Sequence, residues 1–186
     1  MKEASIKELK TRLWSLLKKY AFRLGKVRLS SGKVSNYYLD ARKVTLHPEG
    51  AYLVAEVILR MIKKDKINAI GGPTIGADPI VSAVAVLSHL KDQPIKAFIV
   101  RKTSKEHGLK RQIEGPRLNK KDRVILVDDV ATSGSSLIEA KLALEKEGIK
   151  VRYALAILDR QEGARANLKK AGLKLTSIFK PKDFGV

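Results

Sequence analysis

The chain has 186 residues, enough for one well-buried domain and short for two. A hydrophobic content of 44% argues against disorder, and the absence of cysteine excludes disulfides and thiolate metal sites. The first ten residues are polar and charged, and the longest apolar stretches, such as residues 80–87, are too short to cross a bilayer. We therefore expect a cytoplasmic protein without membrane contact.

The net charge of +19, from 38 basic and 19 acidic residues, is the one extreme value. Such a field attracts nucleic acid, anionic membranes or phosphate-rich small substrates. A surface rich in Lys and Glu, as in heat-adapted proteins, is the alternative explanation. The basic residues are scattered and aromatic residues make up only 5%, so stacking platforms for single strands are not indicated. We favour attraction of a small anion, together with a heat-adapted composition, over nucleic-acid binding.

The N-terminal third begins with an amphipathic helix over residues 5–20. Its apolar side chains recur at three- and four-residue steps, at Ile6, Leu9, Leu13, Leu16 and Tyr20. Residues 27–40 then contain a Ser-Ser-Gly turn signal and the aromatic, β-prone run 37–39. This pattern predicts a strand or hairpin lying outside the main core.

From residue 48 onward, helices and apolar strands alternate. Pro48 suits a first helical turn, and Gly148 suits the position after a helix end. The expected helices are 48–64, 79–90 and 137–147, and the expected strands are 69–72, 95–100, 123–127, 151–158 and 173–179. Near-continuous apolar strands between helices predict an α/β fold, with a mostly parallel central sheet covered by helices on both faces.

The segment 101–121 interrupts this alternation. It is polar, basic, punctuated by Gly108, Gly115 and Pro116, and too long for an ordinary connection. Long loops in compact domains are either disordered or serve as active-site lids. We expect a mobile loop over about residues 102–120.

Residues 123–139, RVILVDDVATSGSSLIE, carry the strongest functional signal. A buried strand leads into Asp128 and Asp129, and five small polar residues then lead into a helix. Ligands of parallel sheets bind beyond the carboxyl ends of the strands, and backbone N–H groups at a helix start can hold a phosphate. The two acids suit sugar hydroxyls or water-bound Mg²⁺. A simple helix cap would explain one hydroxyl residue, not the whole run.

The run VILVDDVATSGSS resembles the motif by which type I phosphoribosyltransferases bind 5-phosphoribosyl-1-pyrophosphate (PRPP). The resemblance implies that 132–136 wrap the 5-phosphate, and that Asp128 and Asp129 address the ribose and reach Mg²⁺ through water, without a direct protein ligand. Residues 71–79, GGPTIGADP, resemble the family's pyrophosphate loop. The implied PRPP-binding residues are Thr74, Ile75, Gly76, Arg101, Lys102, Lys105, His107, Asp128, Asp129, Val130, Ala131, Thr132, Ser133, Gly134, Ser135 and Ser136.

Three further segments resemble the orotate phosphoribosyltransferases within that family: 29–40 (LSSGKVSNYYLD), 101–108 (RKTSKEHG) and 158–162 (LDRQE). The resemblance implies one domain over 1–186, with an N-terminal helix and small hood in 1–45 and the core in 46–186. It also implies that each lid of a homodimer closes over the neighbouring site. The implied orotate-binding residues are Tyr37, Tyr38, Thr132 and Arg160, and the implied catalytic residues are Lys102, Lys105, His107, Asp128 and Asp129.

These residues make chemical sense for ribosyl transfer. Negative charge grows on the leaving pyrophosphate, and the basic loop with Lys102, Lys105 and His107 could neutralise it and exclude water. A solvated basic loop is the alternative. Arg160 could hold the orotate carboxylate, or could simply form an ion pair with Glu162 or Asp159.

The sequence departs from the best-known bacterial pattern at Ser30 and Gly76, where lysine is usual. The leading hypothesis is transfer of phosphoribose from PRPP to orotate with Mg²⁺. The alternatives are a purine phosphoribosyltransferase, which would not need Arg160, and a non-catalytic regulator of the same fold that binds PRPP or nucleic acid.

Overall fold

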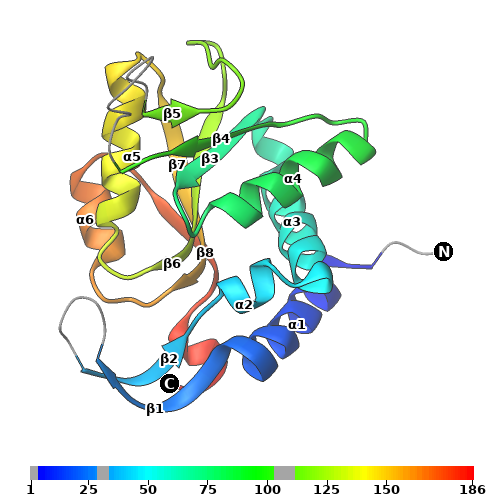
Figure 1. Ribbon diagram of the computed structural model, residues 1–186, viewed down its shortest axis with the longest axis vertical. Coiled ribbons are helices and arrows are strands. Elements are labelled where there is room, and N and C mark those ends of the chain that lie inside the picture. The colour runs from blue at the N-terminus through cyan, green and yellow to red at the C-terminus, as the bar shows by residue number, and fades with distance from the viewer. Residues whose placement is uncertain (1–3, 29–33, 103–111) are drawn as a thin grey trace.

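The computed structural model describes residues 4–28, 34–102 and 112–186 (Figure 1). Helix α1 (Ile6–Leu16) begins with a capping box, in which the Ser5 N–H donates to Glu8 Oε2 at 2.6 Å and the Glu8 N–H donates to Ser5 Oγ at 3.3 Å. A π-helical turn (Leu17–Ala21) extends it. Strands β1 (Phe22–Arg28) and β2 (Val34–Leu39) then form an antiparallel hairpin separate from the main sheet, which confirms the predicted hairpin. It does not lie wholly outside the core, because Tyr37 and Leu39 of β2 are buried with the core residues beneath α1 and α3.

The main sheet has six strands in the order β5-β4-β3-β6-β7-β8. Five strands are parallel, and only the short edge strand β5 runs antiparallel to its neighbour β4. This confirms the mostly parallel sheet. The strands are β3 (Ala69–Pro73), β4 (Lys96–Val100), β5 (Ile113–Glu114), β6 (Val124–Ala131), β7 (Val151–Asp159) and β8 (Leu175–Phe179).

Helices cover both faces of this sheet (Figure 1). Alternate strand residues point to opposite faces, so Ile70 and Ile125 join the core beneath α1, α3 (Pro48–Ile62) and α4 (Asp78–Leu90). Ala69 and Leu126 join the core beneath α5 (Ser135–Lys146) and α6 (Ala164–Lys170). The remaining elements are α2 (Arg42–Thr45) and the 3₁₀ turns Lys63–Asp65 and Pro181–Phe184.

A row of stacked aromatic rings packs the hairpin against the rest of the protein. Phe184, in the last turn, stacks on Phe22 of β1 at 5.2 Å between ring centroids. Phe22 stacks on Tyr37 of β2 at 5.8 Å, and the Trp14 indole N–H donates to the Asp183 carbonyl at 2.8 Å. The hairpin with these contacts is called the hood below. The Tyr37 ring also contacts Arg160, the residue that follows β7.

The structure corrects several expected boundaries. The third strand runs to Ala131 rather than residue 127, because β6 keeps pairing with β7 as far as Ala131 and Asp159. The helix expected over 5–20 ends its α-helical part at Leu16, and the strand expected from 173 begins at Leu175. Gly148 has the positive φ of 74° expected after a helix.

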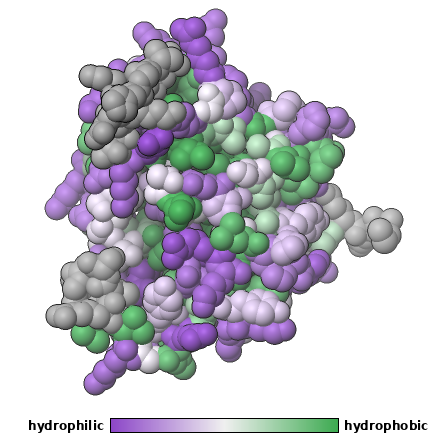
Figure 2. Space-filling model, in the orientation of Figure 1, coloured by the Kyte–Doolittle hydropathy of each residue, from purple (hydrophilic) through white to green (hydrophobic). Residues whose placement is uncertain are grey.

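Hydrophilic residues cover much of the face seen in Figure 2, with hydrophobic side chains exposed in patches between them. No helix within the described ranges is both long and apolar enough to cross a membrane.

Candidate active site

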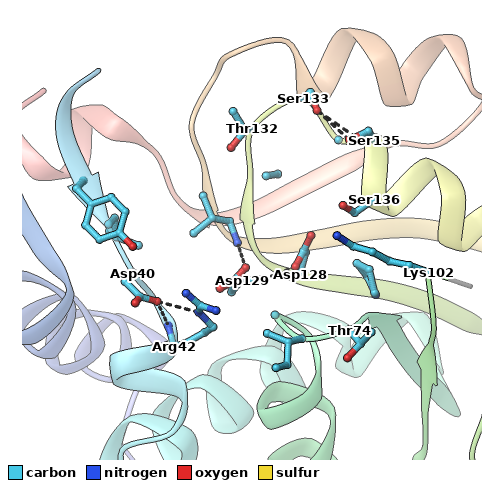
Figure 3. Close-up of a pocket in the computed structure, with 18 residues that line it drawn as sticks. Asp40, Arg42, Thr74, Lys102, Asp128, Asp129, Thr132, Ser133, Ser135 and Ser136 are labelled. Carbon is cyan, nitrogen blue, oxygen red and sulfur yellow. Dashed lines mark hydrogen bonds and ion pairs between the residues drawn. The ribbon is translucent and has the colours of Figure 1, made fainter. Parts of the chain in front are cut away.

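A pocket of about 450 Å³ opens at the carboxyl ends of β3 and β6, next to the hood (Figure 3). The structure brings most of the predicted PRPP-binding residues to its wall. The predicted residues that line it are Tyr38, Thr74, Ile75, Gly76, Lys102, Asp128, Asp129, Val130, Ala131, Thr132, Ser133, Gly134, Ser135 and Ser136.

One end of the pocket is formed by the start of α5. Gly134 precedes this helix with a φ of 79°, a conformation that glycine adopts without strain, and no side chain caps the helix. Ser133 Oγ and Ser135 Oγ lie 3.1 Å apart beside it. The Ser135 N–H donates to Ser133 Oγ at 3.4 Å, but Gly134, the residue that precedes the helix, has no side chain to cap it, so the other backbone donors of the first turn remain available for an anion.

Helix α6 supports the loop over residues 132–134 from behind. The Asn167 side-chain amide donates to the Ser133 carbonyl at 2.9 Å, and the Ala164 N–H donates to the Thr132 carbonyl at 3.1 Å. A Cβ on Gly134 would lie 3.1 Å from Leu168. The loop is thus held on its outer side while its inner side faces the pocket.

The two acids lie side by side on the pocket floor. The Asp129 N–H donates to Asp128 Oδ1 at 2.9 Å, and the Val130 N–H donates to Asp129 Oδ1 at 2.7 Å. Burial, followed by repulsion from the Asp129 carboxylate, raises the pKa of Asp128 well above its ordinary range. Ionised Asp128 is thus costly in the free protein, and hydrogen-bond donors or a cation from a ligand would relieve that cost.

The loop after β3 packs directly on these acids. A Cβ built on Gly76 would lie 2.6 Å from an Oδ1 atom of both Asp128 and Asp129. Thr74 Oγ1 donates to Asp78 Oδ2 at 2.8 Å, and the Thr74–Ile75 peptide bond is cis. A side chain at position 76 would have to displace the carboxylates, so this close approach suits glycine.

Arg160 lies beside the pocket rather than in its wall. The side chain is buried, with the guanidinium carbon 4.3 Å from the centroid of the Tyr37 ring. Its Nε donates to Glu162 Oε1 at 2.8 Å and its Nη2 donates to Ser35 Oγ at 2.9 Å. The ion pair with Glu162 is therefore real, but it engages only part of a guanidinium that has five N–H donors. Tyr37, like Arg160, is absent from the pocket wall, whereas Tyr38 lines it.

The basic loop is described only at its two ends. Lys102 lines the pocket, whereas Arg101 does not and forms an ion pair with Glu114 at 3.5 Å. The Gln112 amide donates to the Arg101 carbonyl at 2.9 Å, which ties the two ends together. Lys105, His107 and the predicted departure at Ser30 lie outside the described residues.

Comparison with known proteins identifies the family. Residues 43–186 match the family model of the phosphoribosyl transferase domain. The chain is 46% identical over 153 residues to the orotate phosphoribosyltransferase of Aquifex aeolicus (strain VF5), covering 82% of this chain and 83% of that protein. This chain belongs to the orotate phosphoribosyltransferase family.

Solved structures of that family have the same fold. Orotate phosphoribosyltransferase of Mycobacterium tuberculosis H37Rv, in complex with Fe(III) dicitrate, superposes with a TM-score of 0.83 at 33% identity. The same enzyme in complex with PRPP gives a TM-score of 0.79 at 30% identity. Each comparison covers 96% of this chain and 99% of the other.

Two charged residues of the pocket were not predicted from the sequence. Asp40 and Arg42 line the pocket between the hood and the loop after β3 (Figure 3). Arg42 Nε donates to Asp40 Oδ1 at 3.0 Å. The signal available was an acid and a base two residues apart, directly after the aromatic run at 37–39, but nothing in the sequence places them opposite Asp129.

Proposed function

We propose that this chain transfers the 5-phosphoribosyl group from PRPP to orotate, giving orotidine 5′-monophosphate and pyrophosphate for pyrimidine nucleotide synthesis. The observation that carries the proposal is Arg160, buried under the hood next to a pocket that has a phosphate loop at one end and two acids on its floor. The PRPP complex of the related M. tuberculosis enzyme supports the choice of donor.

Three parts of the pocket wall suit the 5-phosphate, the ribose and the pyrophosphate of PRPP. The start of α5 and residues 132–136 suit the 5-phosphate, because backbone N–H groups and hydroxyls converge there. Asp128 and Asp129 suit the ribose hydroxyls, which donate hydrogen bonds to carboxylates. Residues 74–76 and Lys102 line the part left for the pyrophosphate.

Arg160 suits the carboxylate of orotate. Glu162 and Ser35 hold two of its nitrogens, and Tyr37 covers one face of the guanidinium, so its remaining donors have a fixed direction. Thr132, Tyr37 and Tyr38 complete the proposed orotate contacts. A purine has no carboxylate, so a buried arginine in this place argues against the purine alternative.

Mg²⁺ fits this pocket as an ion carried by the substrate. The residues described include no cluster of three or more His, Asp or Glu side chains that could hold a metal alone. Asp128 and Asp129 are two adjacent carboxylates facing the proposed ribose position, which suits contact through water. Bound Mg²⁺ would supply charge neutralisation on the pyrophosphate oxygens.

The chain's own groups would act mainly by orientation and charge. The phosphate loop and the acids fix the ribose so that its C1 atom faces the orotate nitrogen. Lys102, with Lys105 and His107 of the same loop, would neutralise the departing pyrophosphate and keep water from the oxocarbenium-like transition state. The same loop would close over the partner's site in a homodimer, and the enzyme would act in the cytoplasm.

A base panel tests the proposed reaction. Purified protein is assayed with PRPP and Mg²⁺ against orotate, uracil, hypoxanthine, guanine and adenine. We expect turnover with orotate, and Arg160→Ala should abolish it while leaving ribose 5-phosphate binding intact. Turnover with a purine alone would refute the assignment.

Mixed chains test the shared loop. Arg160→Ala and Lys102→Ala homodimers should both be inactive. If the loop acts on the partner's site, a mixture of the two variants regains part of the activity, because every mixed dimer then contains one intact site. A mixture as inactive as its parents would refute loop sharing.

A further inference from the structure

The pyrophosphate side of the pocket lacks a cation at position 76, where the best-known members of the family carry lysine. The backbone of Gly76 lies so close to Asp128 and Asp129 that a side chain at position 76 would displace their carboxylates. Among the described residues of the pocket wall, the cationic side chains are Arg42 and Lys102. They lie on opposite sides of the two acids (Figure 3).

Arg42 is held in a way that leaves its outer end available. Its Nε and its backbone N–H both donate to Asp40 Oδ1, at 3.0 and 3.3 Å. Within the described part of the chain, Nη1 and Nη2 make no hydrogen bond. The Arg42 side chain is 46% exposed and the Asp40 side chain 17%, so the carboxylate fixes the stem and the fork faces solvent in the pocket.

The surrounding charge also keeps Arg42 cationic and oriented. The hydrogen bond and charge of Asp40, with a smaller contribution from Asp129, raise the pKa of Arg42. Arg42 therefore lies between an acid that anchors it and an acid proposed to address the ribose. Among the described residues 38–42 that line the pocket from the hood side, Arg42 is the one with a cationic side chain.

We propose that Arg42 binds the diphosphate of PRPP directly, and so supplies the cation that position 76 lacks. The inference rests on the proposed function. A planar guanidinium whose Nε is already engaged presents its two terminal nitrogens as parallel donors, which match two phosphate oxygens. Because charge grows on the diphosphate as the C1–O bond breaks, this contact strengthens toward the transition state and makes Arg42 a catalytic residue.

Two variants on the same short helix separate this role from a general charge effect. Arg42→Gln removes the fork, whereas Lys43→Gln removes the same charge from the next residue, which is exposed and outside the pocket wall. Binding is measured by calorimetry with two probes, pyrophosphate with Mg²⁺ and ribose 5-phosphate. We expect Arg42→Gln to weaken pyrophosphate binding about tenfold or more and ribose 5-phosphate binding less than about twofold. Lys43→Gln should match the wild type with both probes.

Unchanged pyrophosphate binding in Arg42→Gln would overturn the proposal. Equal weakening of both ligands would overturn it too, because Arg42 would then support the whole pocket. Arg42→Lys keeps the charge without the fork and should give an intermediate loss, which provides a second test should the glutamine variant fold poorly. Turnover of orotate by the wild type is followed in parallel. If the wild type binds pyrophosphate but does not consume orotate, the proposed function fails while the test of Arg42 still stands.

Discussion

Substituting Gly134 by alanine tests whether residues 132–136 bind the 5-phosphate. Gly172 serves as the control, because it has a similar backbone conformation and lies away from the pocket. Gly134 has a φ of 79° and Gly172 has a φ of 71°. Gly172 follows α6, and a Cβ there would meet nothing within 4 Å. Alanine at either position forces a left-handed backbone, which costs about 1–2 kcal/mol. The Gly134→Ala methyl would also lie 3.1 Å from Leu168, so the loop or that side chain must shift slightly.

Both variants should therefore lose stability, but only one should lose ligand affinity. For a chain of this size, about 1–2 kcal/mol lowers the melting temperature by roughly 2–8 °C. Any shift at Gly134 moves backbone donors proposed to bind the 5-phosphate. We expect KM for PRPP to rise about tenfold in Gly134→Ala, as for the loss of one or two hydrogen bonds to a charged group. Gly172→Ala should keep the wild-type KM.

The assay is steady-state turnover with varied PRPP, combined with thermal unfolding of each variant. A Gly134→Ala enzyme with a lowered melting temperature and an unchanged KM for PRPP would contradict the proposed phosphate site. An equal rise of KM in Gly172→Ala would show that KM rises because the whole protein is destabilised, and not because the backbone donors of residues 132–136 have moved.

Three other predictions follow from contacts at and away from the site. Because the raised pKa of Asp128 makes its ionisation unfavourable in the folded chain, stability falls as pH rises above the ordinary carboxyl pKa. Asp128→Asn should therefore melt above the wild type at neutral pH without ligand, with the difference shrinking in acid; a constant difference would contradict this. Ser35→Ala removes an acceptor of Arg160 and should raise KM for orotate about threefold to tenfold with KM for PRPP unchanged, as initial rates would show. Asp122→Asn, at the opposite ends of the strands, removes the carboxylate charge that pairs with Lys96 and one of the two hydrogen bonds that Lys96 donates, at 2.9 and 3.0 Å; it should cost about 1–2 kcal/mol in denaturant unfolding and leave kcat unchanged.

The sequence predicted the layers of the core well, because strand periodicity is a local signal. Apolar residues in 123–127 and 151–158 fill both faces of their strands, which only a sheet covered on both sides allows. The pocket wall formed by residues 128–136 was equally visible as a candidate site, since its acids and its small polar residues are adjacent in the chain. These predictions did not need knowledge of distant contacts.

The parts that were missed depend on such contacts. The short helix α6 has seven residues and begins after Gly163, with a φ of 109°, so no long apolar repeat marks it. The extension of β6 to Ala131 comes from pairing with β7. Arg42 reaches the pocket only because the hood places α2 beside Asp129, and Ser35 meets Arg160 across 125 positions of the chain.

The aromatic row has a consequence for how base preference can change. The row runs from Phe184 through Phe22 to Tyr37, and Tyr37 covers Arg160. Apart from Arg42, the groups proposed to hold PRPP lie on the sheet and its loops, whereas Ser35 and Tyr37, two of the three groups that hold Arg160, belong to the hood. If Arg160 binds orotate as proposed, substitutions in the hood, even as far away as the last turn, should alter which base is accepted while residues 132–136 and the two acids stay in place. The preference for the base could in this way change during evolution while the binding of PRPP is kept.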